Sequence, residues 1–380
     1  MQINWQTISK QTFIDQYWQK RPVVLKGAIP NFVDPISPEE LAGLAMEEFV
    51  DSRMISKDKG DWQLQHGPFE DFSRLSEPQS SLLVQGVDNF NGGVQALLSL
   101  VDFIPKWRVD DIMISYSSAN AGVGAHIDQY DVFIIQGQGK RRWLAGDVNR
   151  DIKQTQTCKD LLHVEAFSPV VDEELQTGDI IYIPPFSPHK GITTENALNY
   201  SIGFRAPSSL ELLSAFADYC IDHELGGTRY QDQTLSLETK PFSPSNQEVS
   251  QLKDQLIDLI NSPGLFEQFL NQKLTISSRE LDLVEPAQRV NEQNLFELLN
   301  QYESVQKVLG LKSTCVMQDH KLVYMCAGEV FNVSEQQAAF IQLLQQNQVL
   351  TEEQLKSSLN CIENRQLMTT LINQGYWFFE

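Results

Sequence analysis

The chain has 380 residues, of which 41% are hydrophobic and 21% are charged, and its formal net charge is −21. This length and composition are typical of a globular protein with two or three domains. No apolar run is long enough to cross a membrane as a helix. The negative charge disfavours binding to phosphate backbones or anionic lipid, and it either serves solubility alone or favours a basic protein partner.

The cysteines and the N-terminal segment indicate the compartment. The five cysteines are scattered and include no CxxC pair, which argues against a disulfide framework and for a reducing environment. Residues 1–10 are polar and lack the hydrophobic region of a signal peptide. We therefore expect a cytoplasmic protein that associates with neither membranes nor nucleic acid.

The N-terminal third of the chain mixes short helical patterns with loops. Apolar residues at helical spacing predict a helix within residues 12–20, which Pro22 ends. Ser37 is followed three places later by Glu40, a capping-box pattern that predicts a helix over residues 37–45.

The pattern changes to β-rich runs between residues 111 and 206. Short strands separated by turns with glycine or proline indicate an antiparallel sandwich or barrel. The expected strands cover residues 112–117, 125–136, 140–144, 180–183 and 198–204.

The rest of the chain is mainly helical. Helical patterns cover residues 207–225 and 247–274, and the polar stretch 230–246 between them predicts a long connection. A hairpin within residues 314–325, followed by three short helices, resembles a winged helix. Two of these helices are expected to open at Ser334 and Thr351, each with a glutamine three places later in a capping-box pattern. Acidic residues outnumber basic ones in 334–380, so we expect a protein-interaction or structural module rather than one that binds nucleic acid.

The most specific chemical signal is the sequence GAHID at residues 124–128. If this segment is a strand, His126 and Asp128 point to the same side, because residues two apart share a face. His189 follows the turn and strand TGDIIYIPP at 177–185. In a barrel, this strand can fold back so that His189 lies beside His126 and Asp128. Two imidazoles and one carboxylate on one face of Fe(II) leave sites open for a cosubstrate and oxygen, although zinc accepts the same ligands.

A second signal is GKRRW at residues 139–143. Strand alternation places Arg141 and Trp143 on one face and Arg142 on the other. A guanidinium inside a barrel needs an anion, and its fork suits a carboxylate. A dicarboxylate cosubstrate would supply one, whereas a solvated basic cluster is the alternative that the sequence leaves open.

The other histidines lack partners at the spacing of metal ligands. We expect them to be structural or exposed, and they are His66, His163, His223 and His320.

These motifs, together with NYSIGFRAP at 199–207, resemble those of the JmjC-type ribosomal oxygenases, most closely the bacterial members that hydroxylate an arginine of a large-subunit ribosomal protein. YWQKRP at 17–22 and FADY at 216–219 extend the resemblance to about residue 230, and it continues more weakly to the C-terminus. One departure is FS at 186–187, where the family usually has glycine and then an aromatic residue. The ligand spacing is intact, so the departure concerns the wall near the substrate.

The resemblance implies a mainly β fold with helices. Residues 1–206 would form a double-stranded β-helix catalytic domain of the cupin and JmjC type. Residues 207–290 would form a helical dimerisation region, and residues 291–380 a winged-helix-like domain. The apolar stripe of the helix at 207–225 exceeds what one helix face needs on a monomer, which also favours a homodimer.

The resemblance also implies the reaction. Fe(II), 2-oxoglutarate and O2 would hydroxylate an arginine side chain of a basic ribosomal protein. The catalytic metal ligands would be His126, Asp128 and His189, and the cosubstrate-binding residues would be Arg141, Ser115 and Asn199. Alternatives are a JmjC hydroxylase or demethylase of another protein, a metal-dependent cupin enzyme without 2-oxoglutarate, and an inactive scaffold.

Overall fold

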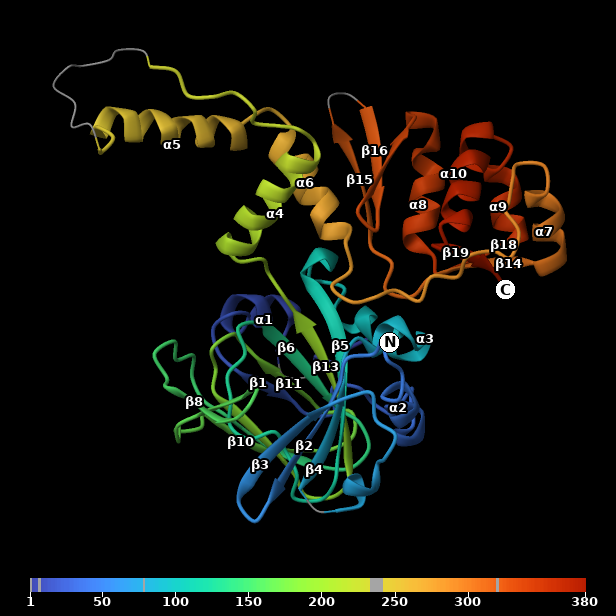
Figure 1. The fold of residues 1–380 in the computed structure, drawn as a ribbon. Helices are drawn as coiled ribbons and strands as arrows, with labels where there is room; N and C mark the ends of the chain where they lie inside the picture. Colours follow the sequence, from blue (N-terminus) through green and yellow to red (C-terminus); the bar gives the residue numbers. More distant parts are fainter. Residues whose placement is uncertain (1, 6–7, 78, 233–241, 319–320) are drawn as a thin grey trace. The chain divides into compact units, whose positions relative to one another are not determined.

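The computed structural model of the chain describes residues 2–5, 8–77, 79–232, 242–318 and 321–380 (Figure 1). His320 and much of the expected connection at 230–246 lie outside the described residues. One compact unit comprises Met1–Ala206 and Ser278–Asp282, and the other comprises Pro207–Ser277 and Leu283–Glu380. In the described part of the chain, no helix combines the length and apolar character of a membrane-spanning segment.

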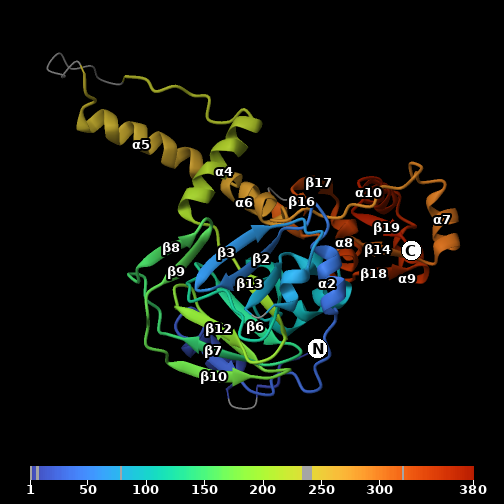
Figure 2. The same ribbon diagram turned by 60° about the horizontal axis from the view of Figure 1, so that its bottom comes forward.

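Two antiparallel sheets form the barrel of the first unit (Figures 1 and 2). The larger has the order β1-β11-β6-β13-β5-β4-β2-β3 and the smaller β10-β7-β12, while β8 and β9 form a separate hairpin. The expected antiparallel barrel is therefore confirmed. Its strands are β1 (Val23–Leu25), β2 (Ser52–Asp58), β3 (Asp61–His66), β4 (Ser80–Val84), β5 (Val109–Ser117), β6 (Asp131–Gln136), β7 (Arg141–Ala145), β8 (Gln154–Cys158), β9 (Leu161–Val164), β10 (Val171–Leu175), β11 (Ile180–Ile183), β12 (His189–Thr193) and β13 (Ala197–Phe204).

Alternation along the strands creates two cores on opposite faces of the larger sheet. The outer core packs against α1 (Lys10–Gln16), α2 (Pro38–Leu44) and α3 (Gly92–Gln95). The inner core takes residues from both sheets, so it fills the space between them. Its buried members are Val132, Ile134, Trp143, Ala145, Leu175, Ile181 and Ile183. The chemically interesting side chains lie on this inner face.

A buried polar network ties the N-terminal segment to the start of β6. The carboxylate of Asp131, which is fully buried, accepts hydrogen bonds from Gln19 Nε2 at 3.0 Å and from the hydroxyl of Tyr182 at 2.5 Å. Arg108 completes an ion pair with it at 3.2 Å, and Trp18 stacks on Tyr182. This network explains why the YWQKRP segment belongs to the barrel.

The second unit is mainly helical and contains two further three-stranded sheets, β18-β14-β19 and β15-β16-β17. The capping boxes that open the helical segments at Ser334 and Thr351 are present, as is the one at Ser37 in the first unit. The elements are α4 (Ser209–Asp222), α5 (Asn246–Ile260), α6 (Leu265–Thr275), α7 (Leu295–Tyr302), β14 (Ser304–Lys307), β15 (Ser313–Gln318), β16 (Lys321–Cys326), β17 (Glu329–Val333), α8 (Ala338–Gln346), β18 (Val349–Thr351), α9 (Glu352–Ser358), α10 (Ile362–Asn373) and β19 (Trp377–Phe379).

Candidate metal centre and cosubstrate pocket

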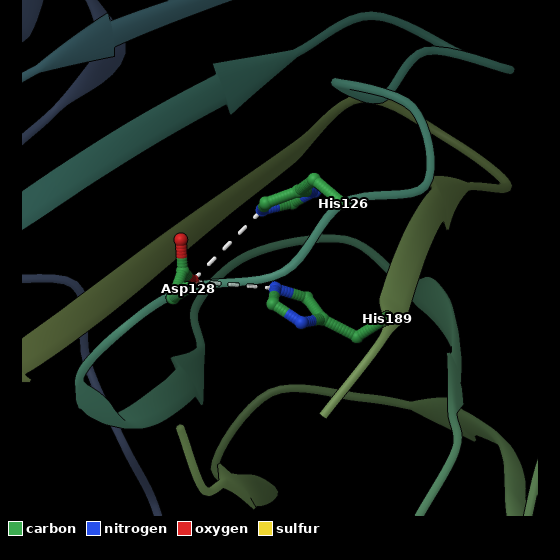
Figure 3. Close-up of side chains that lie close together, drawn as sticks. All are labelled: His126, Asp128 and His189. Atoms are coloured by element: carbon green, nitrogen blue, oxygen red, sulfur yellow. Dashed lines mark ion pairs between the residues drawn. The ribbon is translucent and has the colours of Figure 1, made fainter. Parts of the chain in front are cut away.

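The structure brings His126, Asp128 and His189 together (Figure 3). One possible ligand atom from each residue lies within 4.8 Å of the others. Asp128 Oδ2 is 3.9 Å from Nε2 of His126 and 3.5 Å from Nε2 of His189. In Figure 3 the carboxylate and the two imidazoles point toward a common centre.

The segment that carries two of these residues is not the strand that the sequence predicted. Regular pairing in β6 begins only at Asp131, and residues 127–130 between His126 and this strand form no regular element. An isolated antiparallel bridge replaces the strand. The His126 amide donates to the His189 carbonyl at 3.0 Å, and the His189 amide donates to the His126 carbonyl at 2.9 Å. The backbone itself therefore holds the two imidazoles side by side.

The hydrogen bonds of the two imidazoles set their tautomers. Nδ1 of His126 lies 3.1 Å from the Gly124 carbonyl, and Nδ1 of His189 lies 2.9 Å from the Ser187 carbonyl. A carbonyl can only accept, so Nδ1 carries the proton in each ring and Nε2 turns its lone pair toward Asp128. Burial lowers the pKa of His189 to about 4, which keeps this ring neutral. Two lone pairs and a carboxylate that face one point fit a divalent cation.

Arg141 faces the barrel interior and Arg142 faces outward, as predicted. Arg141 is 6% exposed, and its Nη2 donates to the Ser117 hydroxyl at 2.5 Å. Its Nε is buried without a partner, and no carboxylate of the described residues pairs with it. Burial lowers its pKa to about 10, so the guanidinium remains charged at neutral pH. By contrast, Arg142 forms a bidentate ion pair with Asp172.

Ser115 and Asn199 are register partners on the neighbouring strands β5 and β13, and both are buried. Asn199 Nδ2 donates to Gln136 Oε1 at 2.7 Å, which leaves its Oδ1 buried without a partner. However, the serine that contacts Arg141 is Ser117, and not Ser115 as the resemblance implied. Ser117 lies two residues beyond Ser115 and therefore on the same strand face. This spacing is the feature of the sequence that could have indicated Ser117 as a second candidate.

If the pocket holds 2-oxoglutarate, as the resemblance implies, Ser117→Ala should raise the 2-oxoglutarate concentration required for turnover. Ser117 and Ser81 are fully buried, and their hydroxyl oxygens are 2.8 Å apart, so Ser81 fixes the hydroxyl that orients Arg141. Loss of one such hydrogen bond is worth about 1 kcal/mol, or roughly a fivefold increase. Succinate release measured against 2-oxoglutarate concentration tests this, with Ser80→Ala as a control, and an unchanged requirement in Ser117→Ala would contradict it.

The unusual pair Phe186 and Ser187 lies directly beside the candidate metal ligands. The amide of Phe186 donates to the Asp128 carbonyl at 2.7 Å. Phe186 has φ of +62°, a left-handed conformation that favours glycine and costs other residues about 1–2 kcal/mol. The Arg150 guanidinium lies 4.5 Å from the centre of its ring. The departure from the family pattern thus replaces glycine by an aromatic residue in a strained backbone position.

Comparisons with known proteins give the family of the chain. Residues 96–212 match the model of the JmjC domain, and residues 255–378 match that of the ROXA-like winged helix. The chain is 43% identical to the ribosomal protein uL16 3-hydroxylase of Escherichia coli, over 98% of both proteins. The chain belongs to the ribosomal oxygenase family. A probable ribosomal oxygenase of Haemophilus influenzae is 31% identical over 73% of this chain and 71% of its own length.

Solved structures of a ribosomal oxygenase match the fold of the whole chain. The X-ray structure of E. coli YcfD has a TM-score of 0.90 and 42% identity, and the match covers 100% of both chains. The same protein in complex with cobalt and 2-oxoglutarate has a TM-score of 0.87 and 42% identity, over 100% of this chain and 99% of the other. The expected combination of a JmjC barrel with a C-terminal winged helix is therefore confirmed.

Proposed function

We propose that the chain is an Fe(II)- and 2-oxoglutarate-dependent hydroxylase that acts on an arginine side chain of a large-subunit ribosomal protein in the cytoplasm. The observation that carries this proposal is the uncompensated guanidinium of Arg141, buried in the same barrel as the triad of His126, Asp128 and His189. A buried cation without a counterion is costly, so its retention indicates an anionic ligand. A metal-dependent cupin enzyme without a dicarboxylate cosubstrate has no need for it.

The metal ligands would be the Nε2 atoms of His126 and His189 and the carboxylate of Asp128. When bound, Fe(II) with 2-oxoglutarate and O2 supplies the oxidising power that places one oxygen atom on a substrate carbon and the other in succinate, with release of CO2. Arg141 and Ser117 hold the distal carboxylate of 2-oxoglutarate. The neighbouring apolar side chains of the inner core exclude water from the pocket.

Two observations support a basic ribosomal protein as the substrate. A relative that is 43% identical over nearly the whole chain is named for hydroxylation of ribosomal protein uL16. The net charge of −21 attracts a basic partner over long range. Because the chain matches this relative over 98% of both proteins and carries the complete triad, we infer the same type of reaction for it. The protein uL16 is therefore the first substrate to test.

Mass spectrometry tests the activity. The purified protein is incubated with Fe(II), 2-oxoglutarate and unmodified uL16, and we expect a mass gain of one oxygen atom on an arginine fragment. Omission of 2-oxoglutarate is the control and should abolish the gain. A gain on a different residue type would replace the arginine assignment, and loss of a methyl group from a methylated substrate would favour a demethylase. No change with any ribosomal protein would overturn the proposal.

We also propose that residues 207–290 form a homodimer interface, and this predicts a particle of twice the chain mass. On α4, Phe216 and Cys220 are buried against Phe269, whereas Leu210 and Leu213 are 77% and 62% exposed. Further apolar side chains on α5 are also exposed and need a partner surface. They are Val249, Leu252, Leu256, Ile257 and Ile260.

Light scattering at micromolar concentration measures the dimer. Leu213→Glu places a charge in the exposed apolar surface and should shift the protein to a monomer without loss of fold. Asp258→Lys, on the face of α5 opposite these apolar side chains, is the control and should remain dimeric. A monomeric wild-type protein would contradict the proposal.

A further inference from the structure

The segment that carries His126 is held along both of its edges. On one edge, His126 makes its backbone bridge to His189. On the other edge, the Val164 amide donates to the Ala125 carbonyl at 2.9 Å, and the His163 ring is hydrogen-bonded to the Val123 carbonyl at 2.8 Å. Residues 123–126 thus lie between β12 and the end of β9, although they belong to no regular strand.

His163 is fixed in place by three neighbours. It lies on β9 and is 8% exposed. Because the Val123 carbonyl only accepts, Nε2 of His163 must donate, and Nδ1 then accepts from the Thr157 hydroxyl at 2.9 Å. Trp62 packs edge-on against the ring at 4.7 Å. In Figure 2 the hairpin of β8 and β9 lies beside β3, which carries Trp62.

Gly124 and His163 fit one another. A Cβ atom on Gly124 would lie 2.1 Å from Nε2 of His163, so the imidazole occupies the space where a side chain would be. The carbonyl of this same glycine accepts the Nδ1 proton of His126 at 3.1 Å. His163 therefore holds the peptide segment that orients the His126 ring, without contacting that ring through a hydrogen bond of its own.

We propose that His163 is a positioning residue for the metal ligand His126. Gly122 and Gly124 give the segment more backbone freedom than other residues would, and the bridge to His189 restrains one edge only. On the other edge, the Val164 amide holds the Ala125 carbonyl, and the hydrogen bond from His163 to the Val123 carbonyl fixes the peptide just before Gly124, which keeps the Gly124 carbonyl aimed at Nδ1 of His126. This inference rests on the proposed role of His126 as a metal ligand.

Titration of the metal-free, full-length protein with Co²⁺ tests the proposal, with visible absorption as the readout. His163→Leu removes the donor and leaves the Val123 carbonyl unpaired. We expect it to weaken Co²⁺ binding by up to about tenfold, the lower end of the loss when a direct partner of a metal ligand is removed, because His163 acts through the segment and not on the ring. His163→Gln can still donate to the carbonyl and should recover most of the affinity. The matched control is His66→Leu, because His66 is an exposed histidine on β3.

The outcomes separate positioning from general stability. Unchanged Co²⁺ affinity in His163→Leu would overturn the proposal, even if its melting temperature falls. If His163→Leu does not fold, Thr157→Val is used instead, since it removes only the partner of Nδ1. It should then weaken binding by a smaller factor, and unchanged affinity would again overturn the proposal. A wild-type protein that binds no Co²⁺ would overturn the proposed function itself.

Discussion

Replacing Asp128 by alanine should abolish hydroxylation and weaken metal binding by at least about a hundredfold, because even the loss of a residue behind a ligand costs 10- to 100-fold. Asp128 supplies the one carboxylate of the triad, and its oxygen faces both Nε2 atoms. The side chain is 19% exposed, so its truncation opens no cavity in a core. The fold should therefore survive. Circular dichroism measures the fold, Co²⁺ titration measures metal binding, and succinate release measures turnover.

Asp172→Ala is the matched control for Asp128→Ala. Asp172 is a carboxylate on the outer face of the smaller sheet, where it pairs with Arg142. Its removal should leave metal binding and turnover unchanged. A fully active Asp128→Ala protein would contradict the assignment of the metal centre.

Arg141→Ala should raise the 2-oxoglutarate concentration needed for turnover about tenfold to hundredfold while sparing the metal. A charge-assisted hydrogen bond in a dry pocket is worth roughly 1.5–3 kcal/mol, and each 1.4 kcal/mol corresponds to about tenfold. Arg141→Lys should recover part of the loss, because an ammonium keeps the charge without the bidentate fork. Titration of 2-oxoglutarate against succinate release gives the comparison.

Two further measurements separate a functional role of Arg141 from a structural one. Because its guanidinium is buried without a carboxylate partner among the described residues, Arg141→Ala should not lower the melting temperature through loss of an ion pair. Arg142→Ala, on the outward face, should leave the 2-oxoglutarate requirement unchanged. A sensitive Arg142 and a silent Arg141 would contradict the cosubstrate assignment.

The features that the sequence predicted correctly depend on local spacing. The inward direction of Arg141 and Trp143 follows from the period of two in a strand. The capping boxes at Ser37, Ser334 and Thr351 likewise need only residues that lie three positions apart. Such signals survive folding because the contacts that they describe are made within a single element.

The features that the sequence did not predict depend on contacts between distant segments. His126 and Asp128 converge through the bridge to His189 and not through a continuous strand. Which serine of β5 contacts Arg141 depends on how far the guanidinium reaches from the opposite sheet, and this distance is not encoded in the spacing of either strand. Similarly, the contact of His163 with the His126 segment joins residues 40 positions apart.

The backbone bridge between His126 and His189 has a consequence for metal selection. Because peptide hydrogen bonds hold the two histidine backbones together, the two imidazoles lie side by side before any ion enters. Imidazole and carboxylate ligands bind first-row ions with affinities that rise from Mn²⁺ through Fe²⁺ to Cu²⁺. Ligand affinity alone therefore does not favour iron over the tighter-binding Ni²⁺ or Cu²⁺. Selection of iron must come from the fixed geometry of the ligands and from the supply of metals in the cell.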